Sequence, residues 1–158
     1  EDGGSKMRHY SKIIFVCDSG TSRAPMAEAI LKEYTIRYPL EIESRGLVVL
    51  FPEPINQKAE AILISNGIDM SEKMSSQLTG EDLSPDNLLL TFEAEQREKI
   101  LEQYEEASHA NVQVLTELVG DELEIMNPYG GTLQSYGLCY ETLNKTIQKL
   151  VNLINETD

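Results

Sequence analysis

Strand-length apolar segments alternate with helical patterns along the whole of this 158-residue chain. The segments 12–17 (KIIFVC) and 86–92 (DNLLLTF) are continuous apolar runs, which is typical of strands buried on both faces. Two further strands are predicted over 40–46 and 111–116. Between and after the strands, apolar spacing and composition predict helices over 24–38, 55–66, 93–105 and 132–155. This repeated order predicts an α/β fold: a three-layer sandwich with a four-stranded parallel sheet flanked by helices on both faces.

The first strand ends at Cys17, where a parallel α/β sheet usually places its ligand site. The loop 18–22 that follows holds small or polar residues, and Arg23 and Pro25 open the next helix. Such a loop can turn successive backbone N–H groups inward and form an anion nest at a helix N-terminus. These groups are expected to lower the pKa of the Cys17 thiol, while the Arg23 guanidinium binds two phosphate oxygens. The predicted phosphate-binding residues are Asp18, Ser19, Gly20, Thr21, Ser22 and Arg23.

The net charge of −14, from 13 basic and 27 acidic residues, argues against a nucleic acid or an anionic membrane as a partner. Any anion site must therefore be built locally, as the loop 18–22 allows. The two cysteines do not make a disulfide framework, and no apolar run approaches transmembrane length. No cluster of His, Cys and carboxylate residues has metal-ligand spacing, so no cofactor is expected. These features predict a reducing, cytoplasmic setting.

Residues 12–156 are predicted to form one domain, because no linker or internal repeat interrupts the pattern. Residues 1–11 are polar and are predicted to be an N-terminal extension, in which Met7 is a candidate for the native start.

The segment IIFVCDSGTSRAPMAEAI resembles the phosphate-binding loop of low-molecular-weight protein tyrosine phosphatases, whose usual form is V-C-x-G-N-x-C-R-S-P-M-A-E. The resemblance continues through 59–83, DNLLLTFEAEQREKIL and NPYGGTLQSYGLCYETLNKTIQKLVNLI. It implies the phosphotyrosine protein phosphatase I-like fold and metal-free hydrolysis of phosphate monoesters. It also implies that Cys17 is the nucleophile that forms phosphocysteine, that Arg23 holds the oxyanion and that Tyr129 stacks on an aromatic leaving group. Phe51 and Pro52 are implied either to line the pocket or to anchor their loop.

Asn127 stands where this family has its aspartic general acid. A side-chain amide can form hydrogen bonds but cannot deliver a proton, and loss of a positioned acid costs roughly 10²- to 10⁴-fold in rate. Glu122 and Glu124 are close in sequence and are candidate replacements. Taken without the resemblance, NPYGG simply predicts a turn. Asn127 therefore predicts altered or reduced activity.

The loop itself departs from the family pattern at three further places. Ser19 and Gly20 replace Gly and Asn, so Gly20 can adopt a positive φ but offers no side-chain support. Ala24 lacks the serine hydroxyl that assists departure of the thiolate. Ser22 replaces a second loop cysteine, which closes the route to a protective disulfide, and Cys139 is predicted to be a small core residue.

The predicted function is hydrolysis of a phosphorylated protein side chain or a small aryl phosphate, with phosphotyrosine as the leading substrate. Thr21 matches the branch that resembles protein-arginine phosphatases, which keeps phosphoarginine as an alternative. A catalytically impaired, phosphate-binding pseudophosphatase is a second reading. An arsenate reductase on the same fold is a third, but it requires further redox cysteines near the site. Inorganic phosphate or sulfate is also expected to bind in the loop.

Overall fold

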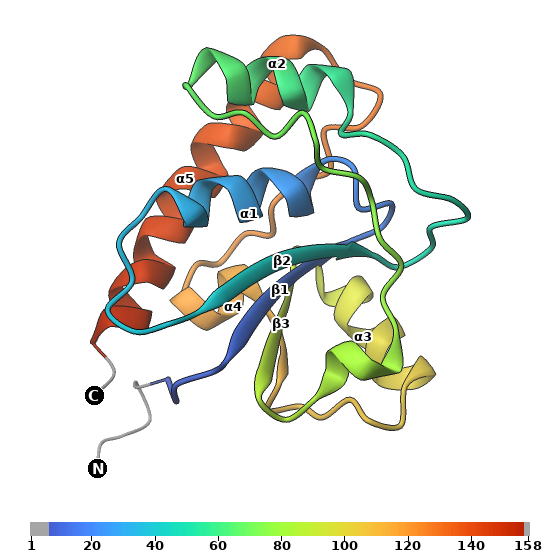
Figure 1. Cartoon of the computed structure of the whole chain (residues 1–158), viewed down its shortest axis with the longest axis vertical. Helices are drawn as coiled ribbons and strands as arrows, with labels where there is room; N and C mark the ends of the chain where they lie inside the picture. Colours follow the sequence, from blue (N-terminus) through green and yellow to red (C-terminus); the bar gives the residue numbers. More distant parts are fainter. Residues whose placement is uncertain (1–6, 157–158) are drawn as a thin grey trace.

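The four predicted strands pair in parallel in a single sheet, in the order β2-β1-β3-β4, in the computed structural model, which describes residues 7–156 (Figure 1). β1 (Lys12–Cys17) and β3 (Asn87–Thr91) occupy the centre of the sheet and are almost entirely buried. β2 (Glu41–Gly46) and β4 (Val112–Val114) form its edges. The predicted α/β class and parallel sheet are therefore confirmed.

Two hydrophobic clusters cover the two faces of the sheet. Ile13 and Phe15 belong to the larger cluster, which also holds buried residues of α1 (Arg23–Lys32), α2 (Gln57–Ser65), α4 (Leu115–Val119) and α5 (Leu133–Asn155). Ile14 and Val16 belong to the smaller cluster, with α3 (Ala94–Gln103) and the 3-10 helix η2 (Gly80–Leu83). Because successive side chains of a strand point to opposite faces, β1 has to be apolar at every central position.

The longest helix, α5, covers α1 and α2 with one apolar stripe that includes Leu143, Ile147 and Leu150. Its N-cap is Thr132, whose hydroxyl accepts a hydrogen bond from the Ser135 N–H at 3.1 Å. Within residues 7–156, none of the helices has the length and apolar character needed to traverse a membrane.

The structure corrects several predicted boundaries. α1 ends at Lys32 instead of continuing to 38, because the next residues bind the end of α5: the Arg37 N–H donates to Asn155 Oδ1, and Asn155 Nδ2 donates to the Thr35 carbonyl. The strand predicted over 111–116 covers only Val112–Val114, and the chain turns at once into α4. Between α2 and β3 lies η2, a segment for which the sequence pattern predicts no helix or strand.

The predicted N-terminal extension lies partly within the described residues. Met7 and Tyr10 are buried against the larger cluster, and the Ser11 N–H donates to the Asp86 carbonyl at 2.8 Å. The remainder of that prediction, residues 1–6, lies outside the described residues.

The segment after β2 holds the loop 18–22 from outside. The Leu47 N–H donates to the Cys17 carbonyl at 2.9 Å, and the Asn56 N–H donates to the Thr21 carbonyl at the same distance. Carbonyl groups that point outward leave the neighbouring N–H groups free to point inward. The path of this segment therefore helps to orient the backbone of the cysteine loop.

Gly46, the last residue of β2, is where this segment meets the loop most closely. A Cβ atom at this position would lie 2.6 Å from the backbone carbon of Ser19 and 2.6 Å from Val49 Cγ2. Because one of these neighbours is main chain, it cannot move aside without displacing the loop. The close approach therefore requires glycine at position 46.

Gly46→Ala is expected to lower the free energy of unfolding by about 2 kcal/mol or more, because the added methyl group overpacks a backbone contact. Urea unfolding followed by circular dichroism measures this change. The matched control is Gly137→Ala in α5, where the new Cβ would lie at an ordinary 3.6 Å from Ile62 Cδ1. That control should raise stability by about 0.5–1 kcal/mol, and equal stability of the two variants would contradict the role given to Gly46.

Candidate active site

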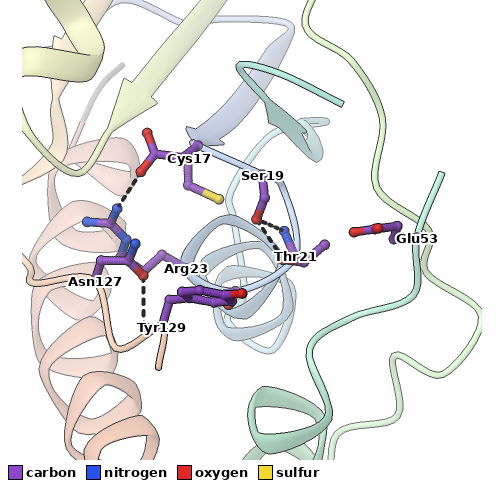
Figure 2. A pocket seen from close by; sticks show the side chains of 9 residues that line it. Cys17, Ser19, Thr21, Arg23, Glu53, Asn127 and Tyr129 are labelled. Carbon is purple, nitrogen blue, oxygen red and sulfur yellow. Dashed lines mark hydrogen bonds and ion pairs between the residues drawn. The ribbon is translucent and has the colours of Figure 1, made fainter. Parts of the chain in front are cut away.

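A pocket of about 260 Å³ opens at the carboxyl end of β1, above the loop 18–22 (Figure 2). Every predicted site residue except Gly20 lines it, and Glu53 joins them. Asn127 and Tyr129 reach the pocket from the segment between α4 and α5, more than 100 residues along the chain from Cys17. The lining residues are Cys17, Asp18, Ser19, Thr21, Ser22, Arg23, Glu53, Asn127 and Tyr129.

Cys17 is 3% exposed and lies at the base of this pocket. Burial raises the pKa of its thiol above the ordinary value. The backbone N–H groups of Ala24, Gly20 and Ser22 bond to the sulfur and act in the opposite direction, as does the Arg23 guanidinium. The prediction of a lowered pKa is therefore wrong in direction, because the loss of hydration outweighs these donors. Converging N–H groups around the sulfur are nonetheless present, as the anion nest requires.

Arg23 is 1% exposed, and its guanidinium makes two hydrogen bonds and a longer ion pair. Nη1 donates to Glu93 Oε2 at 2.7 Å and to the Ile125 carbonyl at 2.7 Å. Nη2 lies 3.6 Å from Asp18 Oδ2 and has no hydrogen-bond partner among the described residues. A buried guanidinium nitrogen that lines a pocket without a hydrogen bond offers its N–H groups to an oxyanion.

Glu93 was not identified from the sequence, although a signal for it exists. It lies two residues after the end of β3, which neighbours β1 in the sheet, so its side chain lies at the same edge as Cys17. Glu93 also caps α3, where it and Gln96 form a reciprocal capping box. The strand order was needed to recognise that this cap also pairs with Arg23.

The loop is supported locally by one serine. Gly20 has a φ of +76°, as predicted from its sequence position. Ser19 Oγ lies 2.7 Å from Thr21 Oγ1 and accepts a hydrogen bond from the Thr21 N–H at 3.3 Å (Figure 2). Ser19 thus provides side-chain support inside the loop, although the sequence analysis assigned none to this stretch.

Asn127 forms a local turn, as the NPYGG pattern predicts. Its Oδ1 accepts a hydrogen bond from the Tyr129 N–H at 3.1 Å, which leaves its Nδ2 as a donor beside the pocket. Tyr129 is 75% exposed at the mouth. Neither candidate replacement acid lines the pocket, and Glu124 Oε2 instead accepts a hydrogen bond from the Ala94 N–H at 2.7 Å. Within residues 7–156, neither glutamate therefore takes the place of the missing acid.

The opposite wall of the pocket is formed by Glu53, which the sequence analysis missed. Its side chain is directed toward Thr21 (Figure 2). Phe51 and Pro52, the expected candidates from the same loop, do not line the pocket, and Phe51 is 63% exposed. No sequence period sets the path of this loop, so the residue that faces the pocket was not predictable from spacing.

Two remaining features bear on the chemistry. Cys139 is buried on α5, and burial raises the pKa of its thiol to about 11, in keeping with the predicted core role. Within residues 7–156, no group of three or more His, Cys, Asp or Glu side chains is arranged to hold a metal ion. The pocket combines a sulfur, converging N–H groups and one guanidinium, which suits a tetrahedral oxyanion.

Comparison with known proteins gives a consistent result. Residues 12–158 match the family model described as low molecular weight phosphotyrosine protein phosphatase. A low molecular weight protein-tyrosine-phosphatase, PtpB of Staphylococcus aureus, is 33% identical over 143 residues, which cover 90% of this chain and 99% of that protein.

Solved structures agree with the family match. The YwlE arginine phosphatase of Geobacillus stearothermophilus superposes with a TM-score of 0.83 at 27% identity, over 90% of this chain and 91% of that one. A low molecular weight protein tyrosine phosphatase from T. tengcongensis gives a TM-score of 0.82 at 30% identity, over 89% and 97% of the two chains.

The alkylation of Cys17 by iodoacetamide is expected to rise with pH through a midpoint above the ordinary thiol pKa, since burial keeps the sulfur protonated. Glu93→Gln should move the midpoint to lower pH, because Arg23 then loses one of its two carboxylate partners. Mass spectrometry of the peptide that contains Cys17 separates its reaction from that of Cys139.

The matched control is Glu95→Gln, an exposed change in the first turn of the same helix, which should leave the midpoint unchanged. A wild-type midpoint at or below the ordinary thiol pKa would contradict the dominant role of burial.

Proposed function

Because the chain belongs to the low molecular weight phosphotyrosine protein phosphatase family, whose members are cysteine-dependent enzymes, we propose that Cys17 is the nucleophile of a protein phosphatase acting first on phosphotyrosine. The observation that carries this proposal is the arrangement of the anion nest. Backbone N–H groups of Ala24, Gly20 and Ser22 converge on the Cys17 sulfur at the base of a pocket. A tetrahedral phosphate seated there would have the sulfur directly beneath it.

The reaction follows from this placement in two steps. Cys17 loses its proton to solvent and attacks phosphorus, so that the S–P bond forms while the P–O bond to the leaving group breaks. The electron pair of that bond departs on the phenolate oxygen. Loop N–H groups and Arg23 Nη2 hold the other phosphate oxygens. Water then attacks the phosphocysteine, the S–P bond breaks, and inorganic phosphate and the thiolate are released.

Asn127 sets which leaving groups the first step tolerates. Its Nδ2 can donate a hydrogen bond to a departing oxygen but cannot transfer a proton to it. A nitrophenolate is stable enough to leave unprotonated, whereas the alkoxide from a simple alkyl phosphate is not. We therefore propose reduced activity with a preference for activated aryl esters.

Asn127→Asp is expected to raise kcat on a phosphotyrosine peptide by about 10²-fold, because it supplies a proton donor to the leaving phenolate. The gain in kcat/KM, which reports the first step, should be smaller on p-nitrophenyl phosphate, and the wild type should hydrolyse this ester far faster than a simple alkyl phosphate. Release of inorganic phosphate under steady-state conditions measures all of these rates.

The control is Asn152→Asp, an exposed change on α5 that adds the same charge far along the chain from the site and should leave kcat unchanged. Cys17→Ser should abolish turnover, and activity that survives this change would overturn the mechanism. Tight binding of a phosphotyrosine peptide with no phosphate release, even at high enzyme concentration, would instead favour a pseudophosphatase.

A second candidate substrate is phosphoarginine, and two lining residues favour it. The Thr21 hydroxyl and the Glu53 side chain lie on the same side of the pocket, where a carboxylate can pair with a guanidinium (Figure 2). One structurally similar protein is an arginine phosphatase, at 27% identity. A protonated phosphoguanidinium also departs as a neutral guanidine when its P–N bond breaks, so this substrate needs no acid at position 127.

Glu53→Gln is expected to lower kcat/KM for a phosphoarginine peptide by about threefold to tenfold, because the guanidinium loses a charged acceptor. The value for a phosphotyrosine peptide should stay unchanged or rise. Exposed Glu72→Gln is the matched control and should affect neither substrate. Equal losses on both peptides would show that Glu53 does not contact the leaving group.

The cellular compartment of the protein and the boundaries of its active domain remain predictions. A reducing, cytoplasmic setting suits a mechanism that needs a free thiol, and both cysteines of the chain are free and buried. Residues 12–156 are proposed to act as one domain on phosphorylated proteins.

A further inference from the structure

A second hollow of about 820 Å³ lies between the segment 123–132 and the first turns of α5. Exposed apolar side chains line it: Leu123 and Met126 are each 83% exposed, and Leu138 is 57% exposed. Ile125 and Cys139 form its buried floor. We call this hollow the α5 groove. Large apolar side chains gathered around a concave surface are typical of binding sites.

The segment that forms one wall of the α5 groove is anchored directly after Leu123 and on both sides of Met126. The Glu124 carboxylate accepts a hydrogen bond from the Ala94 N–H at 2.7 Å, and the Ile125 carbonyl accepts one from Arg23 at 2.7 Å. Farther along, Lys58 Nζ donates to the Gly131 carbonyl. Leu123 and Met126 therefore remain exposed although the backbone that carries them is tied to the protein. A wall fixed in this way needs little ordering when a ligand binds.

The α5 groove adjoins the catalytic pocket, because Asn127 and Tyr129 line both. A protein chain whose phosphorylated side chain enters the catalytic pocket can therefore run beside the groove. We propose that the α5 groove binds an apolar side chain of the phosphoprotein substrate, two residues before or after the phosphorylated one. This inference rests on the proposed function, since it uses the catalytic pocket as the point of entry.

A spacing of two residues is the shortest one at which an extended peptide places a second side chain on the same side as the phosphorylated one. Side chains at positions i and i+2 point to the same side of such a chain. With about 3.3–3.6 Å per residue, they stand about 7 Å apart. The side chains directly before and after the phosphorylated residue point away from the enzyme surface, so they should contribute little to substrate recognition.

The test compares two phosphotyrosine peptides, one with leucine at both positions two residues from the phosphotyrosine and one with serine there. The wild type should show about tenfold higher kcat/KM for the leucine peptide, the effect expected from partial burial of one leucine. Leu138→Ser should remove most of this preference, mainly through KM. Its kcat/KM for p-nitrophenyl phosphate, which has no flanking residues, should stay unchanged.

The matched control is Ile64→Ser on α2, because Ile64 is 59% exposed, as Leu138 is 57% exposed, but lines neither hollow. It should retain the leucine preference. Thermal unfolding of both variants shows that they remain folded. Peptides with a non-hydrolysable difluoromethylphosphonate in place of the phosphate give the same comparison as dissociation constants, so the groove is tested even if no turnover occurs.

Equal affinities of the two non-hydrolysable peptides, or binding of neither, would overturn the inference. A loss of self-association in Leu138→Ser, seen by sedimentation velocity without a change in peptide preference, would also overturn it and assign the groove to a second copy of the chain. Failure of the proposed function looks different, since p-nitrophenyl phosphate would then not be hydrolysed by the wild type.

Discussion

The site depends on where the carbonyl groups of one short loop point. The N–H groups of Gly20, Ser22 and Ala24 can gather around the Cys17 sulfur because carbonyls at Cys17 and Thr21 are bonded outward, to the segment that follows β2. That segment reaches the loop only because position 46 has no side chain. One edge strand and one glycine thus hold the anion nest in a conformation that the loop's own residues support only in part.

Carboxyl groups outnumber guanidinium groups at the pocket. Among the described residues, Arg23 is the only guanidinium that lines it, and this side chain is already paired with Glu93 and lies near Asp18. Glu53 adds a further carboxylate to the opposite wall. A dianionic phosphate gains the loop N–H groups and Arg23 Nη2 but meets these negative charges as well. A substrate with a cationic leaving group would be attracted by the carboxylates, while its phosphate is bound by the loop N–H groups and Arg23. This is the physical basis of the phosphoarginine alternative.

The residues that were predictable from the sequence pattern alone are those whose positions follow from local order. Cys17 to Arg23 form one continuous stretch between a strand and a helix, so the pattern was sufficient to place them, whereas Asn127 and Tyr129 were predicted only from the family resemblance. Glu53 reaches the pocket and Glu93 reaches Arg23 through tertiary contacts, which no period of the sequence encodes. The end of α1 was missed for the same reason, because Asn155 of α5 determines it. The Cys17 pKa was predicted from neighbouring donors alone, whereas burial depends on the whole fold.

The replacement of the acid at position 127 is expected to slow the two chemical steps to different extents. In the first step a substrate can compensate, because a stable phenolate or a protonated phosphoguanidinium departs without receiving a proton from the protein. In the second step the attacking group is always water and the departing group is always the Cys17 thiolate, so no choice of substrate helps. Asn127 offers this water a hydrogen bond but cannot take its proton, and Ala24 offers no hydroxyl to the departing sulfur. We therefore expect the hydrolysis of phosphocysteine to limit turnover for any substrate that passes the first step readily.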